Sequence, residues 1–313
     1  MVSISLESCI MRDKKVTKDN LKNTNVPEAI KDTYHPGLGW ELDWADEFDN
    51  DTIDKNNWNF QVEDAGRFNE EWQRYTNSNQ NAYIENNCLV IKAIHESDEH
   101  GMNQYTSARL NTANKQTFKY GKIAARIKLP HGPGIWPAFW MLGANIDENG
   151  GDTPWPLCGE IDILELYGSR DDAEIEANFH YANKNNSHSS MGGIAYKLSK
   201  GKFSDAFHVF ELEWDEDKFT WYVNGEQFAS MPITSDELSE AHNEYFLLLN
   251  IAVGGTHSGR PNDNTVFPQH MLIDWIRVYH TKEFNINSYF HTQITIILIV
   301  TNKQLTIIIL SNF

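Results

Sequence analysis

Cysteine is scarce in this sequence. The 313 residues include three, Cys9, Cys88 and Cys158, and they lie far apart. An odd number of widely spaced cysteines does not form a disulfide framework, so the chain does not need an oxidising compartment to fold. This observation leaves secretion open.

Basic side chains are outnumbered. The chain has 26 lysines and arginines against 44 aspartates and glutamates, a formal net charge of −18. Binding to nucleic acid depends on Lys and Arg contacts with phosphate, so this composition argues against it. It also disfavours strongly anionic polysaccharides and fits a neutral glycan better. The simpler interpretation, that the acidity keeps the protein soluble, stays open.

Long apolar runs are missing from both ends of the chain. Residues 1–37 are polar, carry mixed charges and contain no complete signal peptide, so we predict a disordered leader or linker, with a truncated signal as the alternative. Residues 282–313 hold two apolar stretches, 294–300 and 305–310, which polar residues separate. Neither stretch reaches the ~20 residues of a membrane span. We interpret this region as an atypical tail, with a membrane anchor as the alternative.

The segment between these ends has the pattern of an all-β domain. Apolar and polar residues alternate with a period of two over 120–129 and 208–214, which predicts strands. Asn224-Gly225 between two such runs predicts a hairpin. Amphipathic helical stretches are few, and 235–242 is the clearest. Many short strands with frequent turns indicate a β-sandwich or jelly roll.

An acidic motif stands out within this domain. Residues 159–168 read Gly-Glu-Ile-Asp-Ile-Leu-Glu-Leu-Tyr-Gly, which predicts a buried strand with three carboxylates. Glu160 and Asp162 share one face of such a strand, whereas Glu165 returns to that face only if a β-bulge adds one residue. Buried carboxylates in a row repel one another and are costly to desolvate, so they imply chemistry or a bound cation.

Paired carboxylates suit glycoside hydrolysis. One attacks the anomeric carbon or activates water, and the other protonates the leaving oxygen, while an acid between them can tune a pKa. A calcium site and an acidic, solvated strand edge are the alternatives that this motif alone leaves open.

At this point the sequence resembles a known family. Glu160-x-Asp162-x-x-Glu165, preceded by Trp155-Pro156-x-Cys158-Gly159, is similar to the signature of glycoside hydrolase family 16, in particular the laminarinase-like endo-β-1,3-glucanases. Four further stretches share the resemblance, which covers about residues 38–281: Trp44-x-Asp46-Glu47-Phe48, Trp136–Leu142, Asn250–Gly255 and Asp274-Trp275-x-Arg277-Val278-Tyr279.

The resemblance implies a fold and an activity. It implies a jelly roll of two curved antiparallel sheets whose concave face forms an open cleft. Glu160 would be the nucleophile, Glu165 the acid/base, and Asp162 would hold Glu160 by a shared hydrogen bond. We expect a monomeric retaining enzyme without an organic cofactor. It would hydrolyse internal β-1,3 bonds of a neutral β-glucan, outside the cell, at its surface or in the periplasm. Additional hydrolysis of β-1,4 bonds in mixed-linkage glucan stays open.

The resemblance also implies residues that bind the sugar. Trp136, Trp140 and Trp155 are candidate platforms for sugar rings, with core packing as the alternative. The remaining candidates are Arg109, His180, Asn69 and Glu71; a surface ion pair is the alternative for Arg109 and a structural role for His180. Gly66-Arg67-Phe68 replaces the usual Gly-Trp-Gly of the family, which puts contacts at the non-reducing side in doubt.

A structural calcium ion is a further expectation. Asp274 interrupts an apolar face, and a buried carboxylate needs a cation or several donors. The resemblance implies that Asp274 binds calcium together with an oxygen from the Glu47 region. A family glycine usually supplies another ligand before Leu89, but Asn86-Asn87-Cys88 stands there, and asparagine tolerates the left-handed conformation that this turn requires.

Two other functions compete with the glucanase. A related hydrolase or transglycosylase could act on another β-glycan, such as a galactan. A non-catalytic glucan-binding protein is the rival from another class. Family members of that kind typically lose the catalytic glutamates, whereas this chain keeps both.

Overall fold

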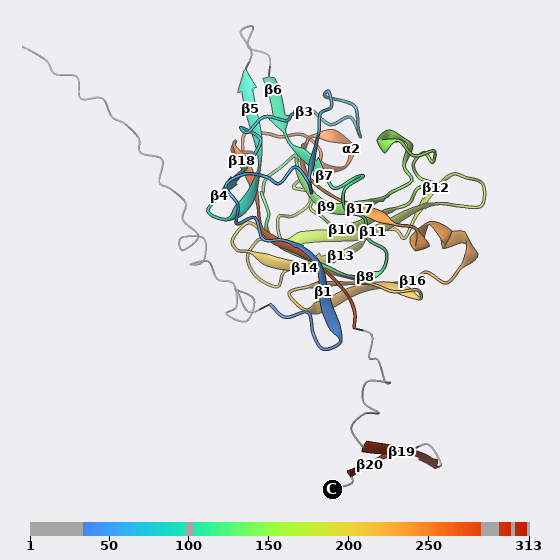
Figure 1. Ribbon diagram of the computed structural model, residues 1–313. Coiled ribbons are helices and arrows are strands. Elements are labelled where there is room, and N and C mark those ends of the chain that lie inside the picture. The colour runs from blue at the N-terminus through green and yellow to red at the C-terminus, as the bar shows by residue number, and fades with distance from the viewer. Residues whose placement is uncertain (1–33, 98–102, 283–293, 302–303, 312–313) are drawn as a thin grey trace, which may run out of the picture.

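Two mainly antiparallel sheets pack against each other and form the body of the protein (Figure 1). The arrangement confirms the predicted all-β jelly-roll class. The computed structural model describes residues 34–97, 103–282, 294–301 and 304–311.

The larger sheet has ten strands and forms the side of the sandwich away from the acidic motif. In spatial order its main path is β16 (Glu226–Pro232), β15 (Lys218–Val223), β14 (His208–Trp214), β8 (Gly121–Lys128), β18 (Gln269–Thr281), β5 (Cys88–Ser97), β6 (Asn103–Ser107) and β3 (Gln73–Tyr75). Two strands join off this path: β1 (Trp40–Asp46) pairs with β18, and β4 (Ala82–Glu85) pairs with β5.

The smaller sheet has eight strands and carries the acidic motif. Its order is β12 (His188–Ser190), β11 (Glu174–Ala182), β10 (Glu160–Glu165), β9 (Ile135–Gly143), β17 (Tyr245–Val253), β7 (Arg109–Asn111) and β2 (Asn59–Gln61), with β13 (Ile194–Lys197) paired to β11. Among the described residues, three short helices lie in the connections: η2 (Asp147–Asn149), η3 (Asp236–His242) and α2 (Gly255–Ser258).

Alternation along the strands builds the core between the sheets. On β14, Phe210, Leu212 and Trp214 are all buried in the main apolar cluster, as the period of two predicts. The predicted hairpin joins β15 to β16, and Asn224 and Gly225 have φ of 54° and 79°, the positive values that a tight hairpin turn needs.

The two predicted end regions are described only in part. Residues 1–33 and 283–293 lie outside the described residues. Tyr34 already packs against Trp275, with ring centroids 5.0 Å apart. At the other end, β19 (Ile294–Thr301) and β20 (Gln304–Ser311) pair with each other as an antiparallel hairpin. Within the described part of the chain, no helix is both long and apolar enough to cross a membrane.

Candidate active site

The strand that carries the acidic motif contains a β-bulge. Asp162 of β10 pairs with Trp140 of β9, and Leu164 pairs with Phe139, so Ile163 is an extra residue. The register against β11 shifts over the same interval. This irregularity confirms the bulge that the spacing of the carboxylates predicts.

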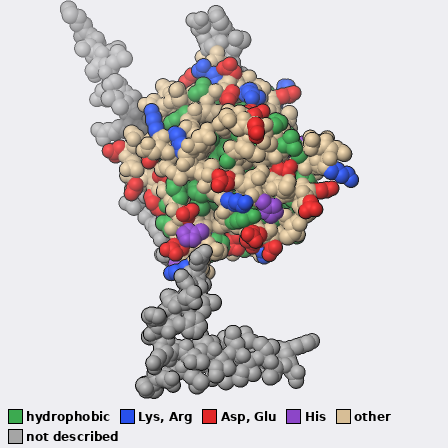
Figure 2. Space-filling model, turned by 45° about the vertical axis from the view of Figure 1, so that its right-hand side comes forward, with side chains coloured by type: hydrophobic (Ala, Val, Ile, Leu, Met, Phe, Trp, Pro, Cys, Tyr) green, Lys and Arg blue, Asp and Glu red, His purple; other side chains and the backbone are tan. Residues whose placement is uncertain are grey.

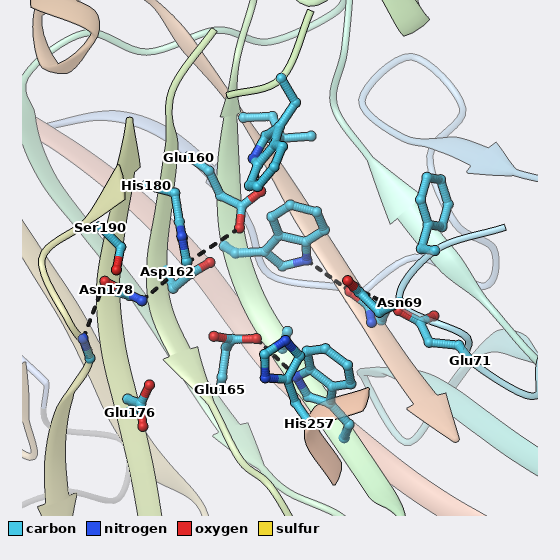
Figure 3. Close-up of a pocket in the computed structure, with 18 of the residues that line it drawn as sticks. Asn69, Glu71, Glu160, Asp162, Glu165, Glu176, Asn178, His180, Ser190 and His257 are labelled. Atoms are coloured by element: carbon cyan, nitrogen blue, oxygen red, sulfur yellow. Dashed lines mark hydrogen bonds and ion pairs between the residues drawn. The ribbon is translucent and has the colours of Figure 1, made fainter. Parts of the chain in front are cut away.

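The bulge divides the side chains of β10 between two environments. Glu160, Asp162 and Glu165 all line one cleft, and they follow one another along the same face of the strand (Figure 3). The apolar residues between them belong to the core. Gly159 leads into the strand at a φ of 79°, where an added Cβ would lie 2.0 Å from Tyr245 Oη, so this close approach requires glycine.

Glu165 is held at both carboxylate oxygens. Trp136 Nε1 donates a hydrogen bond to Oε1 at 2.9 Å, and Tyr167 Oη donates one to Oε2 at 2.8 Å. His257 lies at the edge of the Trp136 ring, 5.2 Å between centroids, and completes an aromatic wall. Burial and the neighbouring Asp162 raise the pKa of Glu165, although the two hydrogen bonds oppose the shift. A carboxyl group with a raised pKa can keep a proton near neutral pH.

Glu160 lies at the other end of the row, beside a histidine. Trp155 Nε1 donates a hydrogen bond to Glu160 Oε2 at 3.1 Å, and His180 Nε2 is 3.8 Å from Oε1. Burial and the charge of Asp162 raise the pKa of Glu160, whereas the nearby His180 and Arg109 partly oppose this shift. The positive charge of Arg109 favours the ionised form, which a nucleophile needs.

Asp162 contacts His180 rather than Glu160. Its Oδ2 lies 3.2 Å from His180 Nε2, and burial raises the pKa of this carboxyl. Among the described residues, the hydrogen bond that we expected between Asp162 and Glu160 is absent. His180 instead lies between the two acids, and its other ring nitrogen is 2.8 Å from His188 Nε2.

A buried hydrogen-bond chain supports the floor of the cleft. Trp140 Nε1 donates to Asn250 Oδ1 at 2.7 Å, Asn250 donates to Tyr75 Oη at 3.1 Å, and Tyr75 Oη donates to Glu71 Oε2 at 3.1 Å. Asn69 Nδ2 also donates to Glu71, at 3.3 Å. This chain fixes the orientation of Glu71 and of the Trp140 ring.

All seven residues predicted to bind sugar line the same cleft as the three acids. The cleft has a volume of about 640 Å³. Trp155 is 44% exposed and can offer its face to a sugar, whereas Trp136 is 7% exposed and its N–H is used by Glu165. Arg109 lies over the Trp140 ring, 4.6 Å from its centroid. Trp155 is therefore the tryptophan best placed as a platform.

Several residues of the cleft were not identified from the sequence. They are Phe68, Tyr167, Glu176, His188, Asn250 and His257. Tyr167 is two positions after Glu165 and lies beyond the end of β10, where alternation no longer predicts a face. His257 follows the Gly254-Gly255 pair, which was a usable signal because that stretch carries the family resemblance.

The two carboxylates predicted to bind calcium lie elsewhere and pair with arginines. Arg126 Nη1 contacts Asp274 Oδ2 at 2.6 Å, with both side chains buried, and Arg277 binds both oxygens of Glu47, at 2.6 and 2.8 Å. Among the described residues, one group of acids and histidine could hold a metal ion. It consists of Glu160, Asp162 and His180, whose ligand atoms all lie within 4.8 Å of one another. Glu47 and Asp274 thus both have arginine partners, and calcium at Asp274 stays a prediction.

Comparisons with known proteins agree with this geometry. Residues 68–277 match the glycosyl hydrolases family 16. A glucan endo-1,3-beta-glucosidase A1 of Niallia circulans is 34% identical over 77% of this chain and 38% of its own length, and a beta-glucanase of Rhodothermus marinus is 34% identical over 78% of this chain and 86% of its own length. The crystal structure of the laminarinase catalytic domain from Thermotoga maritima matches with a TM-score of 0.67 and 45% identity, over 78% of this chain and 99% of that domain. The chain belongs to glycosyl hydrolases family 16.

Proposed function

We propose that this protein is a retaining endo-β-1,3-glucanase that hydrolyses laminarin-type glucans and also β-1,4 bonds of mixed-linkage glucans. The observation that carries the proposal is the bulged strand β10, which brings Glu160 and Glu165 to one face of one open cleft. The names of the matched glucanases and laminarinase support the substrate class.

The proposed reaction has two displacements. An oxygen of Glu160 attacks the anomeric carbon while Glu165 gives its proton to the leaving glycosidic oxygen, which yields a covalent glycosyl-enzyme. The Glu165 carboxylate then takes a proton from water as that water attacks the anomeric carbon and releases Glu160. Two inversions at one carbon give net retention.

The surroundings of the two glutamates support these roles. Burial and the charge of Asp162 raise the pKa of Glu165 and so favour the protonated form that an acid needs, although the hydrogen bonds from Trp136 and Tyr167 oppose this shift. Glu160 lies near Arg109, whose positive charge favours the ionised form of Glu160. No organic cofactor takes part in either step. A structural calcium ion at Asp274 would act on stability rather than on these steps.

The charge of the protein supports a neutral substrate. On the face drawn in Figure 2, acidic side chains are spread among basic ones, and no continuous basic surface is present. With a net charge of −18, a polyanion would be repelled overall. The proposal also includes that the protein is a monomer and that it acts outside the cell, on the cell surface or in the periplasm.

Product analysis on four polysaccharides tests this function. Laminarin should be hydrolysed to a ladder of oligosaccharides, with lichenan second, and agarose and carboxymethyl-cellulose should stay intact. The double variant Glu160→Gln, Glu165→Gln is the control for contaminating activity. Hydrolysis of agarose in preference to laminarin would assign the site to galactans instead.

A further inference from the structure

The cleft has two walls that come from opposite sides of the acidic row. One row of paired residues crosses the sheet at the level of Glu165, through Ala138, Asn250, Arg109 and Gln61. The segment that follows β2 begins after Gln61, at the end of this row. The connection after β9 leaves at Gly143, next to Leu142, which pairs with Glu160. The substrate path therefore runs across the strands between these two connections.

One ion pair joins the two walls. Arg67, in the connection after β2, contacts Glu148 Oε1 of η2 through Nη2 at 2.9 Å. Both side chains line the cleft. In the sheet, β17 and β7 lie between β9 and β2, so the pair spans the part of the cleft that lies over these strands. The two walls are therefore bridged at this end of the cleft.

A stack of side chains fills the space on the inner side of this pair. Arg67 lies over the ring of Phe68 at 4.9 Å, Arg109 over the same ring at 4.5 Å, and Arg109 also over Trp140 at 4.6 Å. Guanidinium and aromatic groups thus alternate from Trp140 on β9 towards the edge strand β2. The stack connects Arg67 of the bridging ion pair to Trp140 in the cleft.

Both partners are fixed by their own connections. Gly66 N donates to Glu71 O at 2.7 Å and Arg67 N to Asp64 O at 3.3 Å, which shape the turn that carries Arg67. On the other wall, Asn114 Nδ2 donates to Asn149 O at 2.9 Å, beside Glu148. The opposite end of the cleft is lined by small residues, Ser190, Gly192 and Gly193.

We propose that Arg67 and Glu148 form a bar that closes the cleft at its β2 end and sets the position of cleavage along the glycan. The inference rests on the proposed glucanase function. Sugar units extend freely over β11 and β12, whereas few fit between the catalytic acids and the bar. The side chains of Arg67 and Glu148 are 51% and 30% exposed, so the pair is weak and can open for the interior of a long chain.

The weakness of the bar fixes the size of the expected effect. An exposed ion pair changes binding by at most about fivefold. Removing it with Glu148→Gln or Arg67→Ala should raise the ratio of kcat/KM on long laminarin to that on laminaritetraose by about three- to fivefold. In 1 M salt, where the Debye length is about 3 Å, the ion pair is screened, so the ratio for wild type should rise towards that of the variants. The ratio for Glu148→Gln should not change with salt, because this variant has no ion pair to screen.

End-labelled laminarihexaose provides the decisive measurement. Wild type should cut at a fixed short distance from one end, and both variants should cut further from that end. Lys197→Ala is the matched control, because it breaks an exposed ion pair with Asp171, at 2.6 Å, away from the cleft lining. Wild-type cleavage positions in both active variants would overturn the bar and leave the glucanase proposal standing. Absence of turnover on every β-1,3-glucan by wild type would refute both.

Discussion

Asp162 and Glu165 are three positions apart on β10 and yet face the same cleft, because Ile163 is the extra residue of a bulge. A regular strand would turn side chains three apart to opposite faces. The bulge thus places an acid at each end of a short row, and the roles of the residues in this row can be tested one by one.

The first prediction concerns the two glutamates. Glu160→Gln and Glu165→Gln should each lower kcat on laminarin by at least about 10²–10⁴-fold, because each removes a step of the double displacement. Circular dichroism should show an unchanged fold.

Azide separates the two roles. With Glu160→Ala, azide should enter the space of the missing nucleophile and give an α-glycosyl azide, whereas Glu165→Ala should give the β-azide. The opposite pairing would reverse the assignment, and near wild-type turnover in either Gln variant would reject it.

Asp162 should set the pH range of activity. Its negative charge raises the pKa of both Glu160 and Glu165. Asp162→Asn removes this charge, so Glu160 ionises and Glu165 loses its proton at lower pH. Both limbs of the kcat/KM profile should therefore move to lower pH. Unmoved limbs with a uniformly lower rate would show that Asp162 acts through geometry alone.

Stability should depend on pH through Glu160. Burial raises the pKa of this group above its unfolded value, so the folded state holds the proton more tightly and stability falls as pH rises between the two values. Glu160→Gln cannot ionise and should melt at a higher temperature than wild type at pH 9, with little difference at pH 4. Calorimetry at both values is the measurement, and Glu226→Gln, on the exposed start of β16, is the control. Equal melting temperatures at pH 9 would argue against a costly ionisation in the fold.

Asp274 offers a test of calcium against arginine. Arg126 already pairs with this buried carboxylate, so equal melting temperatures with excess calcium and with chelator on metal-stripped protein would show that arginine alone neutralises it. Asp274→Asn leaves Arg126 buried without its partner and should cost about 3–5 kcal/mol, which is measured by denaturant unfolding. A clear rise in melting temperature with calcium would instead support the metal site.

Local pattern was sufficient for much of the fold and for the acidic row. The alternation of β14, the turn at Asn224-Gly225 and the bulge at Ile163 all depend on residues that are close in sequence. Such features follow from strand geometry and turn chemistry, which act over a few residues.

Contacts between distant segments could not be predicted in this way. Arg126 and Asp274 are 148 positions apart, so the apolar pattern around Asp274 predicts a buried carboxylate but not which cation it meets. The expected partner of Asp162 also differs, because His180 comes from the neighbouring strand and lies between the two acids. The replacement of the family's Gly-Trp-Gly by Gly66-Arg67-Phe68 was visible in the sequence. The ion-pair partner of Arg67 was not, because Glu148 is 81 positions away.

Retention of configuration is the central claim. If Glu160 and Glu165 act from one face of one strand, attack by Glu160 and later attack by water occur at the same carbon from opposite sides. Proton NMR of the first reducing ends released from laminarin, recorded before mutarotation, measures the outcome directly. The account predicts that the β-anomer appears first; α-anomer first would contradict the double displacement and the role of Glu160 as nucleophile.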